Sequence, residues 1–133
     1  LDCIDAAQIA VVGHSRGGMM TYIALRRQAT VNAAISLAGL SDVRHFKGSR
    51  PPADYAERSA ICWPEAIHTP LLMLHGDADE AVDAGHSLKL AEGLKAADKP
   101  YALHIYPGGN HSLYRVWDDV VARSIGWMKE HRV

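Results

Sequence analysis

The sequence has little of several features that mark particular classes of protein. Its two cysteines, Cys3 and Cys62, are too few for a disulfide framework and lack the paired spacing of a zinc site. No apolar run approaches the roughly 20 residues that a membrane-spanning helix needs. The 14 basic and 15 acidic residues leave no positive excess, which argues against a nucleic-acid-binding protein.

A start methionine and a recognisable leader are also missing. Residues 1–5 read LDCID, which is neither a translation start nor a secretory signal. We therefore expect the chain to begin inside a longer sequence, and any signal peptide would lie upstream of Leu1. We expect a soluble protein. The sequence does not identify its cellular compartment, and of the alternatives we favour the cytoplasm.

What is present is typical of a globular domain. The 133 residues correspond to about one domain, and 48% are hydrophobic and 22% charged. Four short runs rich in Ile, Val and Leu predict strands at 8–12, 33–38, 71–75 and 101–106. The first three runs are continuously apolar, as in parallel strands that are covered on both faces.

Stretches with helical spacing separate or follow these runs. One predicted helix should be largely buried through Met19, Met20, Tyr22, Ile23 and Leu25. A second carries Leu90, Ala91 and Leu94 and should end near residues 98–100. The last has a longer apolar stripe, formed by Leu113, Trp117, Val120, Val121 and Met128. The alternation of strands and helices predicts right-handed crossovers in a three-layer α/β fold with a parallel sheet.

One long segment, 41–68, shows no strong periodicity. It contains Pro51-Pro52 and one predicted short helix at 53–59. A segment of this length is either a lid or pocket wall or a plain surface connection. Phe46, Tyr55 and Trp63 fall in it and either line a substrate pocket or fill the core.

The most informative motif is the hexapeptide 13–18, GHSRGG. It follows a predicted strand and opens a predicted helix, which is the setting of a G-x-S-x-G nucleophile elbow. The tight turn calls for glycine two positions before and after Ser15 and exposes the serine at the positive end of the helix. The backbone N–H of Arg16 should then face an oxyanion, and His14 is free to touch substrate.

A serine nucleophile needs a base and a carboxylate, in the chain order Ser, acid, His for this fold. Asp77 and Asp79 follow the strand at 71–75, and His111 follows the strand at 101–106. Both loops lie past strand ends, where open α/β sheets place their sites. As alternatives, the aspartates are helix-capping or turn residues and the histidine is a surface turn residue.

The other histidines have simpler interpretations. His75, Asp77, Asp83 and His86 could be assembled into a metal site, but none of their spacings is a recognised zinc pattern, so we expect neither a metal nor an organic cofactor. His75 is expected to be a hydrogen-bonded, partly buried strand residue. The remaining ones should be ordinary polar surface or packed side chains: His45, His68, His86, His104 and His131.

Several motifs together resemble the catalytic domain of the prolyl oligopeptidase family, which belongs to the α/β-hydrolase superfamily. The matching residues are 13–18, 55–59 (YAERS), 70–79 followed by Val82, and 106–108 (YPG) before His111. The resemblance runs through nearly the whole chain. It implies that Asp79, rather than Asp77, is the triad acid, with Ser15 as nucleophile and His111 as general base.

The resemblance implies a serine hydrolase that cleaves peptide or ester bonds through an acyl-enzyme. A carboxylesterase or a dienelactone-hydrolase-like lactonase is the alternative, because a triad does not distinguish amide from ester. A hydrolase-fold binding or scaffold domain without turnover is the alternative from another class.

Residues 1–133 are expected to form only the C-terminal part of such a catalytic domain, with four strands. The second oxyanion donor of this fold lies on a loop between an earlier strand and helix, and residues 1–14 leave no room for it. The missing half would come from upstream sequence, from a separate fragment, or from self-association through the 8–12 strand edge. The segment alone is expected to be inactive.

Overall fold

The computed structural model describes residues 5, 7–27, 29–44 and 53–133. Its sheet has four parallel strands in the order β1-β2-β3-β4, which confirms the predicted α/β fold. The strands are β1 (Ala10–His14), β2 (Ala33–Leu37), β3 (Leu71–Gly76) and β4 (Tyr101–Tyr106). The expected strand at 8–12 therefore begins two residues later, at Ala10, and ends at His14, inside the serine motif.

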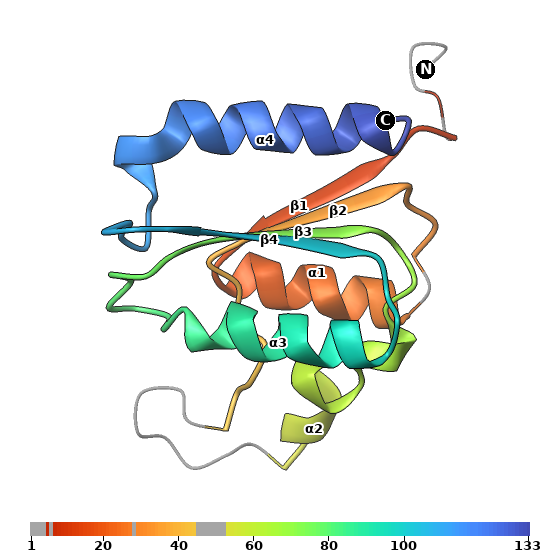
Figure 1. Cartoon of the computed structure of the whole chain (residues 1–133). Coiled ribbons are helices and arrows are strands. Elements are labelled where there is room, and N and C mark those ends of the chain that lie inside the picture. The colour runs from red at the N-terminus through yellow and green to blue at the C-terminus, as the bar shows by residue number, and fades with distance from the viewer. Residues whose placement is uncertain (1–4, 6, 28, 45–52) are drawn as a thin grey trace.

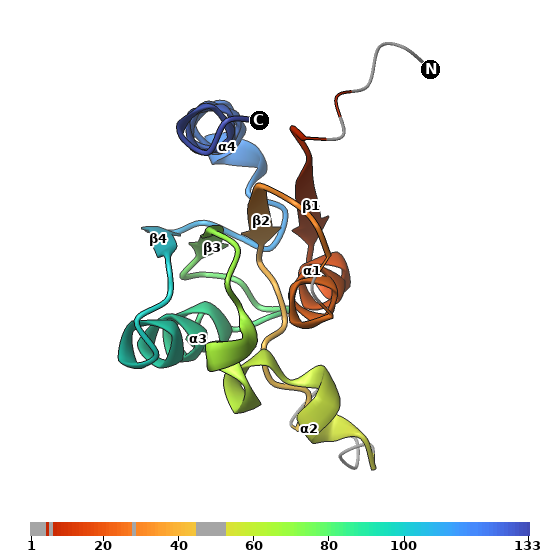
Figure 2. The same cartoon turned by 90° about the vertical axis from the view of Figure 1, so that its right-hand side faces the viewer.

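Helices cover both faces of this sheet. They are α1 (Arg16–Arg26), α2 (Tyr55–Arg58), α3 (Gly85–Ala96) and α4 (Trp117–Glu130), with single 3-10 turns at η2 (Ala60–Cys62), η3 (Pro64–Ala66) and η4 (Tyr114–Val116). Figure 1 shows α1 and α3 on one face and α4 alone on the other. The end-on view in Figure 2 shows the resulting three layers.

The two inner strands form the centre of the core. Every residue of β2 and β3 is buried, as their continuous apolar character predicted. Alternate side chains point to opposite faces. On the α1 and α3 face they join Tyr22, Leu90 and Leu94, and on the α4 face they join Leu113 and Val120.

Parallel pairing brings the carboxyl ends of all four strands to one edge of the sheet. Ser15 follows β1, Asp77 and Asp79 follow β3, and the loop that carries His111 follows β4. Open α/β sheets place their sites in the crevice at this edge. The fold therefore gathers the candidate site residues from segments far apart in the chain.

The segment expected to be irregular is well packed where the structure describes it. It contains α2, η2 and η3, and Trp63 and Ile67 lie in the core cluster with α1 and α3. The hydroxyl of Ser59 accepts a hydrogen bond from the Val43 N–H at 3.1 Å. Residues 45–52, which include Phe46 and His45, lie outside the described residues.

Two helices expose more apolar surface than their spacing predicts. Met20 in α1 is 55% exposed, so the expected burial is wrong for this residue, although Met19, Tyr22 and Leu25 are buried. In α4, Val120 is buried, but Trp117, Val121 and Ile125 are exposed along one side of the helix. The spacing of apolar residues along a helix does not show how many of them another element buries.

The outer edge of β1 has no neighbouring strand among the described residues. Val12 in this strand is 55% exposed, whereas Ile35, its partner in β2, is fully buried beneath α4. Paired residues of parallel strands share a face, so the exposed Val12 side chain lies on the α4 face. No helix in the described part of the chain is both long and apolar enough to cross a membrane.

Candidate active site

Ser15 lies in a sharp turn between β1 and α1. Its backbone has φ 58° and ψ −116°, a conformation that costs a non-glycine residue about 1–3 kcal/mol and that occurs at functional sites. Its N–H donates to the carbonyl of Leu37 at 2.8 Å, which ties the turn to β2. The side chain makes no capping hydrogen bond to α1, although serine commonly does so at this position. The hydroxyl is therefore free of local backbone partners.

The glycines around Ser15 differ in their roles. A Cβ on Gly13 would collide with the carbonyl of Gly17, and a Cβ on Gly18 would lie 2.7 Å from the Cα of Gly39. A Cβ on Gly17, in contrast, would meet nothing within 4 Å. The tight turn was expected to require glycine two positions before Ser15 and two positions after it. This prediction is wrong for Gly17, the later of the two. The close approach of α1 to β2 instead requires Gly18.

His111 and Asp79 are joined by a short hydrogen bond. The ring Nδ1 of His111 lies 2.7 Å from Oδ2 of Asp79, and the Asp79 side chain is fully buried. The other carboxylate oxygen of Asp79 accepts the N–H groups of Ala81 and Val82 at 2.9 and 2.8 Å. Because a carboxylate only accepts, the proton on His111 lies on Nδ1, and Nε2 is left able to take up another proton.

The environment of Asp79 favours its charged form. Burial by itself raises the pKa of this carboxyl, but the N–H of Val82, the His111 ring and the N–H of Ala81 together hold the pKa below its ordinary value. Asp79 is thus ionised at neutral pH. An ionised acid can orient the imidazole and stabilise the cation that forms when Nε2 accepts a proton.

Asp77, the other candidate acid, does not contact His111 in the described hydrogen bonds. It is exposed, and its carboxylate accepts the Gly108 N–H at 2.6 Å. Its own N–H donates to Tyr106 at 3.1 Å. These two bonds connect the loops that follow β3 and β4.

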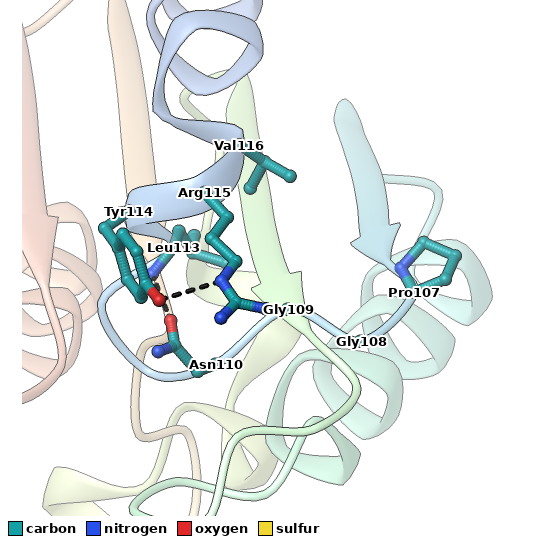
Figure 3. Close-up of a pocket in the computed structure, with 8 residues that line it drawn as sticks. All are labelled: Pro107, Gly108, Gly109, Asn110, Leu113, Tyr114, Arg115 and Val116. Carbon is teal, nitrogen blue, oxygen red and sulfur yellow. Dashed lines mark hydrogen bonds between the residues drawn. The ribbon is translucent and has the colours of Figure 1, made fainter.

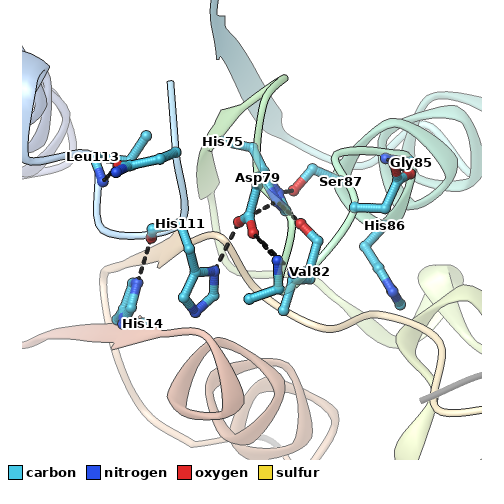
Figure 4. Close-up of polar contacts among 12 residues, drawn as sticks. His14, His75, Asp79, Val82, Gly85, His86, Ser87, His111 and Leu113 are labelled. Carbon is cyan, nitrogen blue, oxygen red and sulfur yellow. Dashed lines mark hydrogen bonds and ion pairs between the residues drawn. The ribbon is translucent and has the colours of Figure 1, made fainter. Parts of the chain in front are cut away.

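His14 links the His111 loop to the serine turn. Its Nε2 lies 2.8 Å from the carbonyl oxygen of His111, and the two ring centroids are 4.7 Å apart. Figure 4 shows His111 between His14 and Asp79. No hydrogen bond among the described residues joins Ser15 directly to His111; such bonds are often long in a ligand-free site.

The backbone N–H of Arg16 is the third element of the arrangement. Arg16 is the first residue of α1, so its N–H has no carbonyl partner within the helix. The positive end of the helix dipole lies at the same place. An N–H there can stabilise negative charge that develops on an oxygen next to Ser15.

His75 is a buried polar residue of this site whose role the sequence does not reveal. The side chain is fully buried, whereas partial burial was expected. Its Nε2 lies 2.8 Å from the carbonyl of Val82, and its Nδ1 lies 2.7 Å from the hydroxyl of Ser87. Nε2 also lies 3.3 Å from Oδ2 of Asp79. His75 therefore supports the loop that presents Asp79 (Figure 4).

His86 is a second histidine with an unexpected place. It was expected on the surface, but it is half-buried, and its Nδ1 accepts the N–H groups of Ser41 and Asp42 at 3.2 Å each. Burial lowers its pKa, which favours the neutral ring that can accept these bonds. The hydroxyl of Ser41 donates to the His86 carbonyl at 2.7 Å. The contact joins the segment after β2 to the start of α3.

The expected pocket residues fare differently. Trp63 is 5% exposed in the core, and its ring N–H donates to the Ala56 carbonyl at 2.9 Å, so it fills the core. Tyr55 is half-buried beside a cluster that includes Met19 and Val82, with the Arg44 guanidinium 5.8 Å from its ring centre. Phe46 lies outside the described residues.

A cavity of about 470 Å³ opens beside the His111 loop (Figure 3). Neither Ser15, Asp79 nor His111 lines it. Two of its lining residues contact each other: the guanidinium of Arg115 donates to the phenol oxygen of Tyr114 at 2.8 Å. Its lining consists of Pro107, Gly108, Gly109, Asn110, Leu113, Tyr114, Arg115 and Val116.

Metal chemistry has no candidate centre in the described part of the chain. No group of three or more His, Cys, Asp and Glu side chains there is arranged to hold an ion. The side chains proposed as an alternative metal set have other partners. His75 and His86 bind backbone and hydroxyl groups, and Asp83 accepts the Gly85 N–H at 2.7 Å.

One protein-family model matches nearly the whole chain. The model of the prolyl oligopeptidase family matches residues 1–132. The chain belongs to this family. The resemblance found in the sequence motifs is thereby confirmed, and the match covers all three candidate triad residues.

Individual proteins that resemble this chain in sequence or structure are named as peptidases. The chain is 30% identical over 126 residues to a protein from Talaromyces marneffei named a probable dipeptidyl-aminopeptidase B, covering 84% of this chain and 14% of that protein. It resembles the crystal structure of Porphyromonas gingivalis dipeptidyl peptidase 4 with a TM-score of 0.84, at 26% identity over 96% of this chain and 20% of the other. A Mycobacterium tuberculosis puromycin-hydrolyzing peptidase gives a TM-score of 0.74, at 29% identity over 80% of this chain and 19% of the other. The chain thus spans a fifth or less of the length of these relatives.

Proposed function

We propose that this chain carries the catalytic triad of a serine peptidase of the prolyl oligopeptidase type. The observation that carries the proposal is the hydrogen bond between His111 and the buried, ionised Asp79, beside the strained turn of Ser15. His14 brings the two together, because it precedes Ser15 and contacts His111.

The proposed reaction has two halves. Nε2 of His111 takes the hydroxyl proton of Ser15 as Oγ bonds to the substrate carbonyl carbon, and the same proton then passes to the leaving amine as the C–N bond breaks. Water repeats the sequence on the acyl-enzyme and releases the acid and free Ser15. Asp79 keeps the His111 proton on Nδ1 and stabilises the imidazolium. The Arg16 N–H donates to the oxyanion, a contribution of about 2.7–4 kcal/mol for one such donor in a known serine protease.

Peptide bonds are the proposed substrate class. The similar proteins are named as dipeptidyl and puromycin-hydrolyzing peptidases, and two of the three compared sequences exceed 28% identity over most of this chain. The triad acts on the scissile bond, and further groups are needed to orient a peptide and to select its side chains. We therefore propose that residues outside this chain's described part help to bind the substrate.

A further strand is the proposed partner of the β1 edge. Exposed backbone groups of an edge strand readily pair with another strand, and the exposed Val12 would be covered by the same partner. The exposed apolar side of α4 adds to the surface that such a partner would bury. A loop from that partner could supply the second oxyanion donor. The complete gene product should then hydrolyse activated esters much faster than residues 1–133 alone.

Covalent labelling tests the proposed nucleophile. A fluorophosphonate probe should label the complete gene product, and Ser15→Ala should abolish labelling. Ser112→Ala is the matched control, because Ser112 is an exposed serine next to His111 whose hydroxyl only contacts Asn110. Labelling that persists in Ser15→Ala, or disappears in Ser112→Ala alone, would refute the assignment of Ser15. Matched aminoacyl amide and ester substrates then distinguish a peptidase from an esterase.

A further inference from the structure

His14 occupies the variable position of the serine motif, directly before Ser15. Its side chain reaches the loop after β4. The Nε2 atom lies 2.8 Å from the carbonyl oxygen of His111, a residue 97 positions away in the chain. Because a carbonyl oxygen only accepts, the His14 ring carries its proton on Nε2 and donates it.

His111 itself has few other attachments, although Asp77 holds Gly108 in the same loop. Residues 107–113 form neither helix nor strand, and within them His111 makes two side-chain-mediated contacts among the described residues. The bond from His111 Nδ1 to Asp79 orients the ring about the loop after β3. The bond from His14 holds the His111 backbone at the end of β1. The two contacts approach His111 from opposite sides, as Figure 4 shows.

We infer that His14 is a positioning residue that sets the distance between the Ser15 hydroxyl and the His111 ring. The inference rests on the proposed function. His14 and Ser15 are adjacent, so a bond from His14 to the backbone of His111 fixes the base relative to the nucleophile. A displacement of about 1 Å between reacting groups can lower a rate by about 100-fold.

We expect His14 to act by positioning His111 and not by binding substrate. Its only described polar contact is the His111 carbonyl, and its ring lies 4.7 Å from the His111 ring, tilted by 48°. Loss of the bond should therefore affect the chemical step and not the affinity for substrate. Since His14 is exposed, substitutions there should leave the fold intact.

Two substitutions in the complete gene product separate the bond from the ring. His14→Phe keeps a flat ring but removes the donor. His14→Gln removes the ring but keeps an N–H donor the same number of bonds from Cα as Nε2. His68→Phe is the matched control, because His68 is an exposed histidine whose described contact is Lys99, away from the site.

The expected result is a split between kcat and KM. In His14→Phe, kcat and kcat/KM should fall together by about tenfold with KM unchanged. His14→Gln should recover most of this loss, and His68→Phe should match the wild type. Urea unfolding midpoints should agree among all four proteins. A raised KM with unchanged kcat, or equal loss in both His14 variants, would overturn the inference.

A second measurement does not depend on turnover. The proton on Nδ1 of His111, held by Asp79, gives a downfield NMR signal whose exchange with water reports how well the loop is held. The signal should broaden in His14→Phe and persist in His14→Gln; an unchanged signal in His14→Phe overturns the inference. The signal can behave in this way in the two variants while the wild type fails to react with a fluorophosphonate. In that case the proposed function fails and the positioning role of His14 stands.

Discussion

The Nε2 atom of His75 lies 3.3 Å from Oδ2 of Asp79, and neither side chain is exposed to solvent. The same carboxylate oxygen accepts the hydrogen bond from His111. Two histidines thus approach one buried oxygen, one from the core and one from the open edge of the sheet. The inner histidine donates to the Val82 carbonyl and so holds the loop in which Asp79 lies.

We expect His75→Leu to destabilise the protein by about 2–6 kcal/mol. The substitution leaves the Val82 carbonyl and the Ser87 hydroxyl buried without their partner, and such groups cost about 1–3 kcal/mol each. The measurement is the free energy of unfolding in urea. His104→Leu is the control, because His104 is a partly buried residue of β4 whose ring packs against that of Tyr106 and makes no side-chain hydrogen bond in the described structure. Equal stability of the two variants would contradict the supporting role of His75.

The two candidate acids should respond differently to the same substitution. Asp79→Asn in the complete gene product should lower kcat by about 10⁴-fold, as for the acid of a well-studied triad, because asparagine no longer holds the proton on Nδ1 of His111. Asp77→Asn should be mild, since Asp77 is exposed and its side chain bonds only the Gly108 N–H in the described structure. Steady-state hydrolysis of one activated ester measures both. A crippled Asp77→Asn beside a mild Asp79→Asn would reverse the assignment.

Much of the fold follows from local patterns in the sequence. The strands β2 and β3 coincide with continuous apolar runs, because buried parallel strands need apolar side chains on both faces. The edge strand β4 coincides with the fourth predicted run. The loops that carry Asp79 and His111 could also be located, since they directly follow such strands. The structure brings these two side chains together at the edge where parallel strands end.

Other features depend on partners that no local pattern reveals. His75 and His86 belong to no recognisable motif in the sequence. The partners of His75 are Val82 and Ser87, 7 and 12 residues further along the chain, and the partner of His86 is Ser41, 45 residues before it. The exposure of Met20 likewise depends on which flank of α1 meets the sheet. Helical spacing shows which side chains share one side of a helix, whereas tertiary packing decides how many of them are buried.

His86 should make stability depend on pH. Burial lowers its pKa in the folded protein below the ordinary value of about 6.5. Between the two values the unfolded chain binds more protons, so stability should rise with pH through this window and level off above about 6.5. Protonation would also remove the Nδ1 lone pair that accepts the N–H groups of Ser41 and Asp42.

The measurement is the urea midpoint of the wild type and His86→Asn between pH 5 and 8. The difference between the two proteins should grow as the pH rises and become constant above about pH 7. His68→Asn is the control for the substitution itself, because His68 is an exposed histidine that contacts Lys99 and not Ser41 or Asp42. A constant difference between the wild type and His86→Asn across the range would show that His86 is not the group responsible.

The two glycines of the serine turn should differ sharply when changed to alanine. A Cβ at Gly13 would meet the backbone of Gly17, which is fixed within α1 and cannot rotate away as a flexible side chain could. Overpacking of this kind typically costs about 1–3 kcal/mol, so Gly13→Ala should lower the urea midpoint and the rate of fluorophosphonate labelling. Gly17→Ala is the matched control: its Cβ would meet nothing within 4 Å, so the midpoint should stay close to that of the wild type. If Gly13→Ala proved as stable and as reactive as Gly17→Ala, the close approach of β1 to the first turn of α1 would not constrain the Ser15 turn.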